Sequence, residues 1–121
     1  MESTRRAGAA AIVVALLMLT GCTPQPSSDV PGKWGSTDPG EPNLIIDSDG
    51  SYTGSDGCNT MSGKGTISGT TIELGTVATT QKACADVDTW MSTAESGKAD
   101  GNTMIVYDSS GKKIGTLQRN D

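Results

Sequence analysis

The side chains with the most chemistry to offer in this 121-residue sequence are its three cysteines, Cys22, Cys58 and Cys84. A cysteine thiol can form a disulfide, bind a metal, act as a nucleophile or carry a covalent modification. The sequence has no histidine and no Cys-x-x-Cys pair, so it lacks the commonest partners of a zinc-binding or catalytic thiol. The segments around each cysteine therefore decide which chemistry applies.

The segment before Cys22 has the pattern of an export signal. Arg5 and Arg6 precede an apolar run from Ala7 to Leu19 that only Gly8 interrupts. This run is shorter than the roughly 20 apolar residues of a membrane-spanning helix. A short apolar run with a basic start and small residues at its end is typical of a secretory signal peptide.

The residues that end this signal are more specific. Leu19-Thr20-Gly21-Cys22 resembles the lipobox of bacterial lipoproteins, in which an aliphatic residue and two small residues precede a cysteine. In those proteins the thiol receives a diacylglycerol and a peptidase cuts before the cysteine. The resemblance implies that residues 1–21 are a lipoprotein signal peptide and that Cys22 anchors the exported chain in the cell membrane or envelope. An ordinary secretory signal that contains a cysteine is the alternative.

Lipidation of Cys22 would leave Cys58 and Cys84 as the two remaining thiols. An exported protein folds in an oxidising compartment, so we expect these two cysteines to form a disulfide. Closing a loop of about 27 residues would stabilise the fold by roughly 3 kcal/mol. The chain has no Phe, two Trp and two Tyr, so a small core would gain from this crosslink. A reactive or metal-binding thiol pair is the alternative.

The charge of the chain bears on its partners. The sequence carries 9 basic and 14 acidic residues, a net charge of −5. Removing residues 1–21 takes away Arg5, Arg6 and Glu2, which leaves seven basic and 13 acidic residues and a net charge of −6. An acidic domain has no electrostatic footprint for nucleic acid, so we exclude nucleic-acid binding. Membrane attachment must then come from the lipid on Cys22.

The residues after Cys22 divide into a linker and one domain. Thr23 to Gly32 reads TPQPSSDVPG, and its proline and serine content is typical of a tether. We therefore expect the lipidated cysteine and a flexible tether over residues 22–32. The folded part is expected over residues 33–121, beginning near Trp34.

Within that domain, short segments of alternating apolar and polar residues are separated by turn residues. Asp-Gly and Ser-Gly pairs between such segments are typical of β-hairpins. The pattern predicts an antiparallel β-meander, and the fold class is mainly β with one helix. The strand candidates are residues 43–47, 51–55, 64–68, 70–74, 103–107 and 112–119.

The exception is the segment from Asp86 to Gly97, which predicts a short amphipathic helix. Its apolar residues recur at i, i+3, i+4 and i+7, which places them on one helix face. Asp86 is the expected N-cap and Gly97 the expected C-terminal cap. The stripe consists of Val87, Trp90, Met91 and Ala94. We expect this helix to pack on the sheet with Trp90 as its main buried side chain. A ligand or partner surface formed by the stripe is the alternative.

The stretch from Ser55 to Cys84 resembles the centre of the META domain family, typified by the heat-shock lipoprotein HslJ. The matching residues are Gly57-Cys58-Asn59, the hairpin that ends at Leu74, and Thr80 followed by Ala83-Cys84. The later elements follow in the family's order, so the resemblance covers nearly the whole exported domain. It implies a curled, barrel-like antiparallel sheet packed on one short α-helix. It also implies a structural role for the motif residues Gly57, Asn59, Thr80 and Ala83.

The META resemblance and the export signal together predict the class of function. The family has no established catalytic residues, so we expect no enzyme, no catalytic residue, no metal and no cofactor. We expect a non-catalytic, lipid-anchored envelope protein that binds an envelope partner or supports tolerance of envelope stress. The alternative is a small-ligand or lipid-binding module that uses the hollow of the curled sheet. An apolar cavity of a few hundred Å3 would favour the ligand module, and a filled interior with an exposed apolar patch would favour the partner-binding protein.

Overall fold

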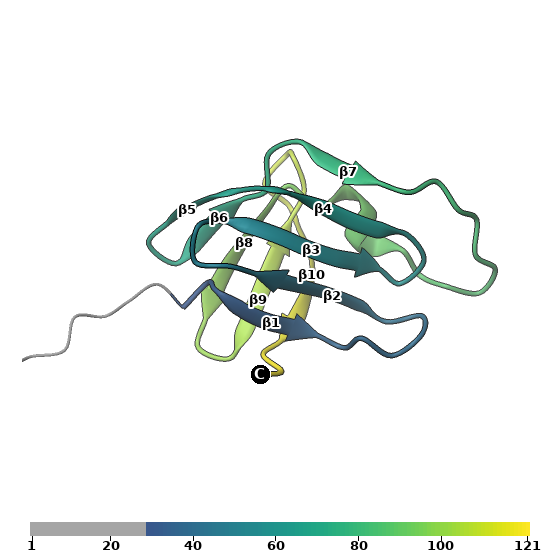
Figure 1. Cartoon of the computed structure of the whole chain (residues 1–121), viewed down its shortest axis with the longest axis horizontal. Helices are drawn as coiled ribbons and strands as arrows, with labels where there is room; N and C mark the ends of the chain where they lie inside the picture. The colour runs from purple at the N-terminus through teal and green to yellow at the C-terminus, as the bar shows by residue number, and fades with distance from the viewer. Residues whose placement is uncertain (1–28) are drawn as a thin grey trace, which may run out of the picture.

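The computed structural model describes residues 29–121, which form ten short strands and one turn of 3-10 helix (Figure 1). The predicted signal peptide over 1–21, the predicted lipidation of Cys22 and most of the predicted tether lie outside the described residues. Among residues 29–121, no helix has the length and apolar character needed to cross a membrane.

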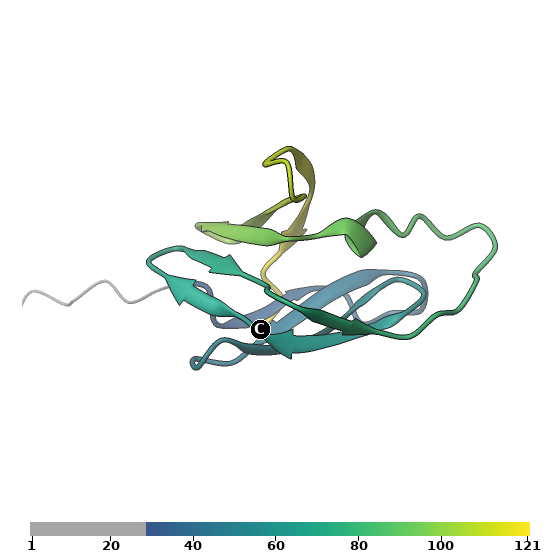
Figure 2. The ribbon, with the colours of Figure 1, turned by 90° about the horizontal axis from the view of Figure 1, so that it is seen from above.

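The strands form two antiparallel sheets of five strands each. The first sheet contains, in spatial order, β1 (Gly32–Gly35), β2 (Pro42–Ile46), β3 (Ser51–Asp56), β4 (Thr60–Lys64) and β7 (Val77–Thr79). The second sheet contains, in spatial order, β10 (Lys113–Gln118), β9 (Thr103–Tyr107), β8 (Ser96–Asp100), β6 (Thr71–Glu73) and β5 (Thr66–Ser68). The two sheets lie in separate layers (Figure 2), and β8, β9 and β10 cross behind β1 to β4 (Figure 1).

The hairpin turns follow the expected turn chemistry, as the connection between β2 and β3 illustrates. The amide of Gly50 donates to the carbonyl of Asp47 over 3.0 Å, and Gly50 has a φ of 93°. A Cβ at Gly50 would lie 2.3 Å from the carbonyl oxygen of Gly65, so only glycine fits here. The side chain and backbone of Ser51 both donate to the Asp49 carboxylate, which lowers the pKa of Asp49.

The meander is interrupted where the chain passes from one sheet to the other. After β4 the chain bends at the buried Gly65, forms the β5–β6 hairpin in the second sheet, and returns to the first sheet as β7. A Cβ at Gly65 would lie 2.7 Å from the carbonyl oxygen of Glu73, so the bend needs a glycine. The predicted barrel-like closure is wrong, because β5 and β7 end their sheets as edge strands and the two sheets do not close into a barrel.

The predicted helix over Asp86–Gly97 is also wrong. The structure has one turn of 3-10 helix there, η2 (Trp90–Thr93), and β8 begins before the expected helix end. Asp86, the expected N-cap, has a left-handed backbone with a φ of 59°. The amide of Glu95 donates to the carbonyl of Tyr107 over 2.8 Å, which draws the end of the segment into the second sheet. A helix of about 12 residues is marginal by itself, so sheet pairing overrides the apolar periodicity.

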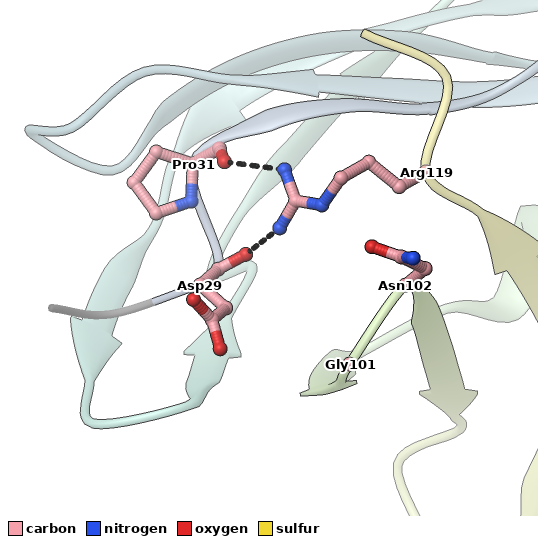
Figure 3. Close-up of a pocket in the computed structure, with 5 residues that line it drawn as sticks. All are labelled: Asp29, Pro31, Gly101, Asn102 and Arg119. Carbon is pink, nitrogen blue, oxygen red and sulfur yellow. Dashed lines mark hydrogen bonds between the residues drawn. The ribbon is translucent and has the colours of Figure 1, made fainter. Parts of the chain in front are cut away.

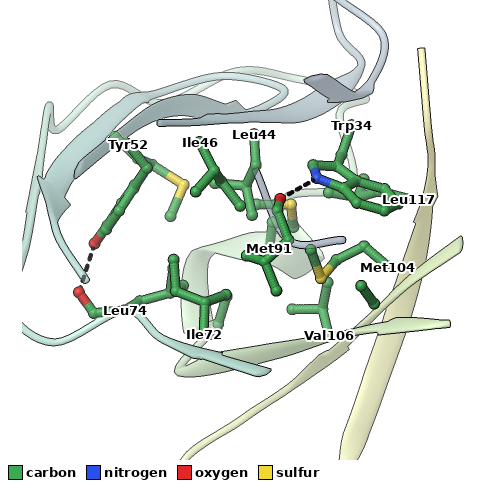
Figure 4. Close-up of a cluster of buried hydrophobic side chains, with 14 residues drawn as sticks. Trp34, Leu44, Ile46, Tyr52, Ile72, Leu74, Met91, Met104, Val106 and Leu117 are labelled. Carbon is green, nitrogen blue, oxygen red and sulfur yellow. Dashed lines mark hydrogen bonds between the residues drawn. The ribbon is translucent and has the colours of Figure 1, made fainter. Parts of the chain in front are cut away.

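The space between the sheets is filled by side chains (Figure 4). Among residues 29–121, fourteen hydrophobic residues are buried, and Trp34 is the largest of the fully buried side chains. The core comprises Val30, Trp34, Leu44, Ile46, Tyr52, Met61, Ile72, Leu74, Met91, Ala94, Ala99, Met104, Val106 and Leu117. The Tyr52 hydroxyl donates to the carbonyl of Leu74 over 3.0 Å. Burial, followed by the charge of Glu95, raises the pKa of Tyr52.

Trp90 is therefore not the main buried aromatic residue. It is half-buried and packs against the edge of the core, whereas Met91 beside it is fully buried. The Trp90 ring lies over β10, where a Cβ at Gly115 would come within 2.5 Å of it. The absence of a side chain at Gly115 thus makes room for the indole. Trp34 in β1 supplies the large buried ring that the sequence pattern assigned to Trp90.

Candidate functional site

Two groups of residues join distant parts of the chain and are the candidate functional regions. The first is the loop tie, which we define as residues 56–59 and 80–84. The second is the terminal clamp, which we define as Arg119 with residues 29–34 and Asp121.

The predicted disulfide between Cys58 and Cys84 is present in the structure and is the covalent part of the loop tie. The two Cα atoms are 5.9 Å apart, and the residues are 26 positions apart in the sequence. The bond joins the β3–β4 turn to the segment after β7. Because both sulfur atoms are in this bond, the structure does not show the alternative of a reactive or metal-binding thiol pair.

The turn that carries Cys58 is held by a buried carboxylate. Asp56 is 1% exposed, and its Oδ1 accepts the amides of Cys58 over 2.8 Å and Asn59 over 2.6 Å. Gly57, between Asp56 and Cys58, has a φ of 98°, and a Cβ there would lie 2.9 Å from the carbonyl oxygen of Gly40. Sequence reasoning missed Asp56, although an Asp followed by Gly is a turn signal that could have indicated it.

Asn59 links this turn to the segment after β7 by polar contacts. Its Oδ1 accepts the Lys82 amide over 2.6 Å and the Thr80 hydroxyl over 3.0 Å, and its Nδ2 donates to the Lys82 carbonyl over 3.3 Å. Thr80 Oγ1 in turn accepts the amide of Thr60 over 3.0 Å. Gly57, Asn59 and Thr80 therefore lie together around the disulfide. Ala83, the fourth predicted motif residue, is exposed beside Cys84.

The loop tie restrains the exposed loop over residues 80–89. Most residues from Thr80 to Thr89 are exposed, including the polar side chains of Lys82, Asp86 and Asp88. Val87 is half-buried, and a Cβ at Gly57 would lie 3.1 Å from its Cγ1. Among residues 29–121, no group of three His, Cys, Asp or Glu side chains is arranged to hold a metal ion. The disulfide and the Asn59 contacts thus fix an exposed loop at the end of the first sheet.

The terminal clamp centres on Arg119 (Figure 3). Its guanidinium donates to the carbonyl of Pro31 over 3.2 Å and to the carbonyl of Asp29. It also lies over the Trp34 ring, 4.1 Å from the ring centroid. A planar guanidinium can stack on an aromatic ring while it donates in its own plane, which a lysine ammonium cannot do. Arg119 thus joins the beginning of the described chain to its end.

The same region buries the chain before β1. Val30 is fully buried, and its carbonyl accepts the Trp34 indole N–H over 2.9 Å. The amide of Asn120 donates to the carbonyl of Lys33 over 2.8 Å, and the Lys33 amide donates to the Asp121 carboxylate over 3.2 Å. The predicted tether extended to residue 32, but the folded structure already includes Val30. The apolar side chain at Val30, between Asp29 and Pro31, was the available signal.

A surface hollow of about 420 Å3 lies beside the clamp (Figure 3). It is open to solvent and is lined by Asp29, Pro31, Gly101, Asn102 and Arg119. A second open hollow of about 360 Å3 is lined by Arg119 together with residues of the β1–β2 loop and β10. These hollows are on the surface, whereas the space between the sheets is filled by the hydrophobic core.

Comparison with known proteins identifies the family. The sequence profile of the META domain matches residues 27–121 of the chain. The chain belongs to the META domain family. The match begins close to Val30, where the folded structure begins, and it confirms the resemblance inferred from the Gly57-Cys58-Asn59 and Ala83-Cys84 motifs. No curated protein is similar enough in sequence to count as a match.

One solved structure has the same fold. It was determined by NMR and superposes on this META domain with a TM-score of 0.55, covering 74% of this chain and 90% of that chain. The two sequences are 16% identical, so the similarity extends to the fold alone.

Proposed function

We propose that this protein is a non-catalytic, lipid-anchored component of the cell envelope whose META domain presents a surface to a partner protein. The observation that carries this proposal is the filled interior: the core side chains occupy the space in which a ligand module would hold its ligand. A binding function then falls to the outer surface. The family membership supports an envelope role, and the lipobox pattern at Cys22 supports the anchor.

The terminal clamp determines where the anchor would meet the domain. Because Arg119 holds the carbonyl of Asp29, only residues 23–28 separate Cys22 from the part of the domain that Arg119 holds. The seven peptide steps from Cys22 to Asp29 span at most about 25 Å when fully extended. The anchored domain would therefore stay close to the membrane, with the clamp facing the lipid.

The loop tie lies at the other end of the first sheet. β1 leads away from the clamp, and β2 begins after the next loop at Pro42, which pairs with Asp56 of the loop tie. Figure 1 shows the loop after β7 on the side opposite the start of β1. A loop that is braced, exposed and turned away from the anchor is well placed to contact a partner. We therefore assign the partner-binding surface to residues 80–89.

The anchor is tested by replacing its cysteine. Full-length Cys22→Ala should retain the signal peptide and carry no lipid, whereas Ser28→Ala, a control in the linker, should be processed normally. Intact-mass measurement of chains extracted from membranes distinguishes these products. A parent chain that begins at a residue other than Cys22 and carries no acyl mass would refute the anchor.

The partner surface is tested by site-specific photo-crosslinking in cells. A photoreactive residue at the exposed Gln81 should give one reproducible crosslinked product. The same residue at the exposed Ser109, in the β9–β10 turn, is the matched control and should give none. Equal crosslinking at both positions, or none at Gln81, would contradict the assignment of this loop. If the partner maintains the envelope, cells that lack the protein should also be more sensitive to envelope stress.

A further inference from the structure

The two edges of the first sheet differ in how their backbone groups are used. At the β1 edge, the C-terminal residues cover the strand. The Asn120 amide donates to the Lys33 carbonyl over 2.8 Å, and the Asp121 carboxylate accepts the Lys33 amide over 3.2 Å. A β-bridge between Trp34 and Arg119 continues this cover. The β1 edge therefore has little capacity to pair with another strand.

The β7 edge is open in the described structure. The amide of Thr80 donates to the carbonyl of Thr60, which shows that the even-numbered residues of this strand direct their backbone groups toward β4. Because antiparallel ladders alternate, the amide and carbonyl groups of Val77 and Thr79 point away from β4. β7 ends the first sheet, and none of residues 29–121 pairs with this outer side.

β7 is only three residues long, and short length is one way in which natural proteins limit pairing at an edge strand, but β7 lacks three other common protections. These are charged side chains, proline and a β-bulge. The three residues of β7 are Val77, Ala78 and Thr79, and their register with β4 contains no irregularity. The neighbouring side chains on the sheet are small, and they line a shallow, open hollow of about 260 Å3. The hollow is lined by Thr60, Ser62, Ala78, Thr79 and Thr80.

We propose that β7 pairs with β7 of a second copy of this chain, antiparallel and about a two-fold axis at Ala78. In this register Val77 of one copy lies opposite Thr79 of the other. Both residues direct their amide and carbonyl groups outward, so the pair forms hydrogen bonds in both directions. The two-fold axis repeats these bonds, and the two five-stranded sheets become one continuous sheet. The contact is isologous, the arrangement found in most homodimers.

The charges at the two ends of β7 favour a second copy over an unrelated strand. The exposed Lys82 lies beyond the Thr79 end. The exposed Glu73 and Glu95 lie beyond the Val77 end, where the Leu74 amide donates to the Glu95 carbonyl over 3.0 Å. Antiparallel pairing about Ala78 brings the lysine end of each copy toward the glutamate end of the other. Lys82 and Glu73 are the charged residues nearest to the two ends of β7 along the chain, and their unlike charges favour this register.

A cysteine at the two-fold axis tests the pairing directly. Two residues that face each other without hydrogen bonds in an antiparallel pair have Cα atoms about 4.5 Å apart, within the range of a disulfide. Full-length Ala78→Cys, oxidised in intact producing cells, should run as a dimer on non-reducing gels. Thr53→Cys is the matched control, because Thr53 is exposed in the central strand β3 and lies on the same cross-strand row as Ala78. It should stay monomeric.

A second substitution separates pairing from chance contact. Proline at position 79 removes an amide that points outward, a change that an edge strand tolerates. Ala78→Cys with Thr79→Pro should lose the dimer while its thermal unfolding midpoint stays close to that of Ala78→Cys. A dimer that survives the proline in a folded chain would overturn the proposal, and so would equal crosslinking of Thr53→Cys. A crosslinked product with the mass of a different protein would show that β7 accepts a foreign strand, which also refutes self-pairing. None of these results depends on whether Cys22 carries a lipid.

Discussion

The terminal clamp and the loop tie both join distant parts of the chain, but they do so with different chemistry. In the clamp, Arg119 reaches the carbonyl of Asp29, 90 residues away in the sequence, and lies over the fully buried ring of Trp34. In the loop tie, a disulfide joins Cys58 to Cys84, 26 residues apart, at the surface. The clamp is non-covalent and rests on the core, whereas the tie includes a covalent bond near the surface.

This difference determines how each region stabilises the fold. The clamp acts on the folded state, because it satisfies backbone carbonyls and covers a core residue. A disulfide acts mainly on the unfolded chain by restricting its conformations. Damage to the clamp should therefore loosen the native structure around β1 and β10. Loss of the disulfide should lower global stability and leave most native contacts in place.

Removing the Trp34 indole, which lies under the Arg119 guanidinium, should have the largest effect on stability. Trp34→Ala should lower the free energy of unfolding by about 3–5 kcal/mol, the usual loss for a buried tryptophan. Because domains of this size hold only about 5–15 kcal/mol in total, the variant should be partly unfolded. Trp90→Ala is the control, and its loss should be clearly smaller because Trp90 is half-buried. Urea unfolding compares the two, and equal losses would contradict the assignment of Trp34 as the main core aromatic.

Removing the disulfide should have the next largest effect. Replacing Cys58 and Cys84 together by alanine should lower the free energy of unfolding by roughly 2–5 kcal/mol. The contacts of Asn59 with the Lys82 backbone should persist, since they do not need the disulfide. Hydrogen exchange tests this point: the Lys82 amide should stay protected in the double alanine variant and lose protection when Asn59→Ala is added. Loss of that protection in the double variant alone would show that the disulfide is the only restraint on the loop.

Replacing Arg119, at the centre of the clamp, should lower the free energy of unfolding by less than removing the disulfide. Arg119→Ala should lower the free energy of unfolding by about 1.5–3 kcal/mol, the range for hydrogen bonds to a charged group. Arg119→Lys should restore little of the loss, because an ammonium cannot reach both carbonyls and stack on Trp34 at once. Limited proteolysis near Asp29 should become faster in both variants. Full rescue by lysine would mean that charge, and not planar geometry, holds the clamp.

The smallest effect concerns the core between the two regions. Tyr52→Phe removes one hydrogen bond and should lower the free energy of unfolding by about 1 kcal/mol near neutral pH. The folded state raises the pKa of Tyr52 above the ordinary value of 10.0, so the folded state holds this proton more tightly than the unfolded chain. The stability linked to this proton is therefore present below pH 10 and is lost as pH rises beyond it. Urea unfolding of the parent should show this alkaline loss, and Tyr52→Phe should show less of it. Identical alkaline slopes would contradict the raised pKa.

Local patterns were sufficient for much of the fold. Alternating segments bounded by Asp-Gly and Ser-Gly predicted six strand regions, and Thr103–Tyr107 has the predicted bounds. The disulfide followed from counting thiols. These features depend on neighbouring residues or on composition, and both are visible in one sequence.

Local patterns failed where sheet pairing competed with them. The apolar period around Met91 and Ala94 is helical, and both side chains are buried, but the chain there forms one 3-10 turn and then β8. The short strands β1, β4 and β7 were also missed, because β1 and β4 contain one apolar residue each and β7 has only three residues. Their conformation comes from the neighbouring strands with which they pair.

The sequence by itself determined the META family, the predominance of antiparallel strands and the pairing of Cys58 with Cys84, because motifs, turn residues and thiol number are local or countable properties. It also carries the lipobox pattern from which the anchor at Cys22 is proposed. Only the tertiary structure decided that two open sheets replace a barrel, that Trp34 and not Trp90 forms the aromatic core, and that Arg119 binds the backbone of Asp29 and Pro31. Each of these outcomes depends on contacts between residues far apart in the sequence, and no local pattern specifies which distant groups will meet.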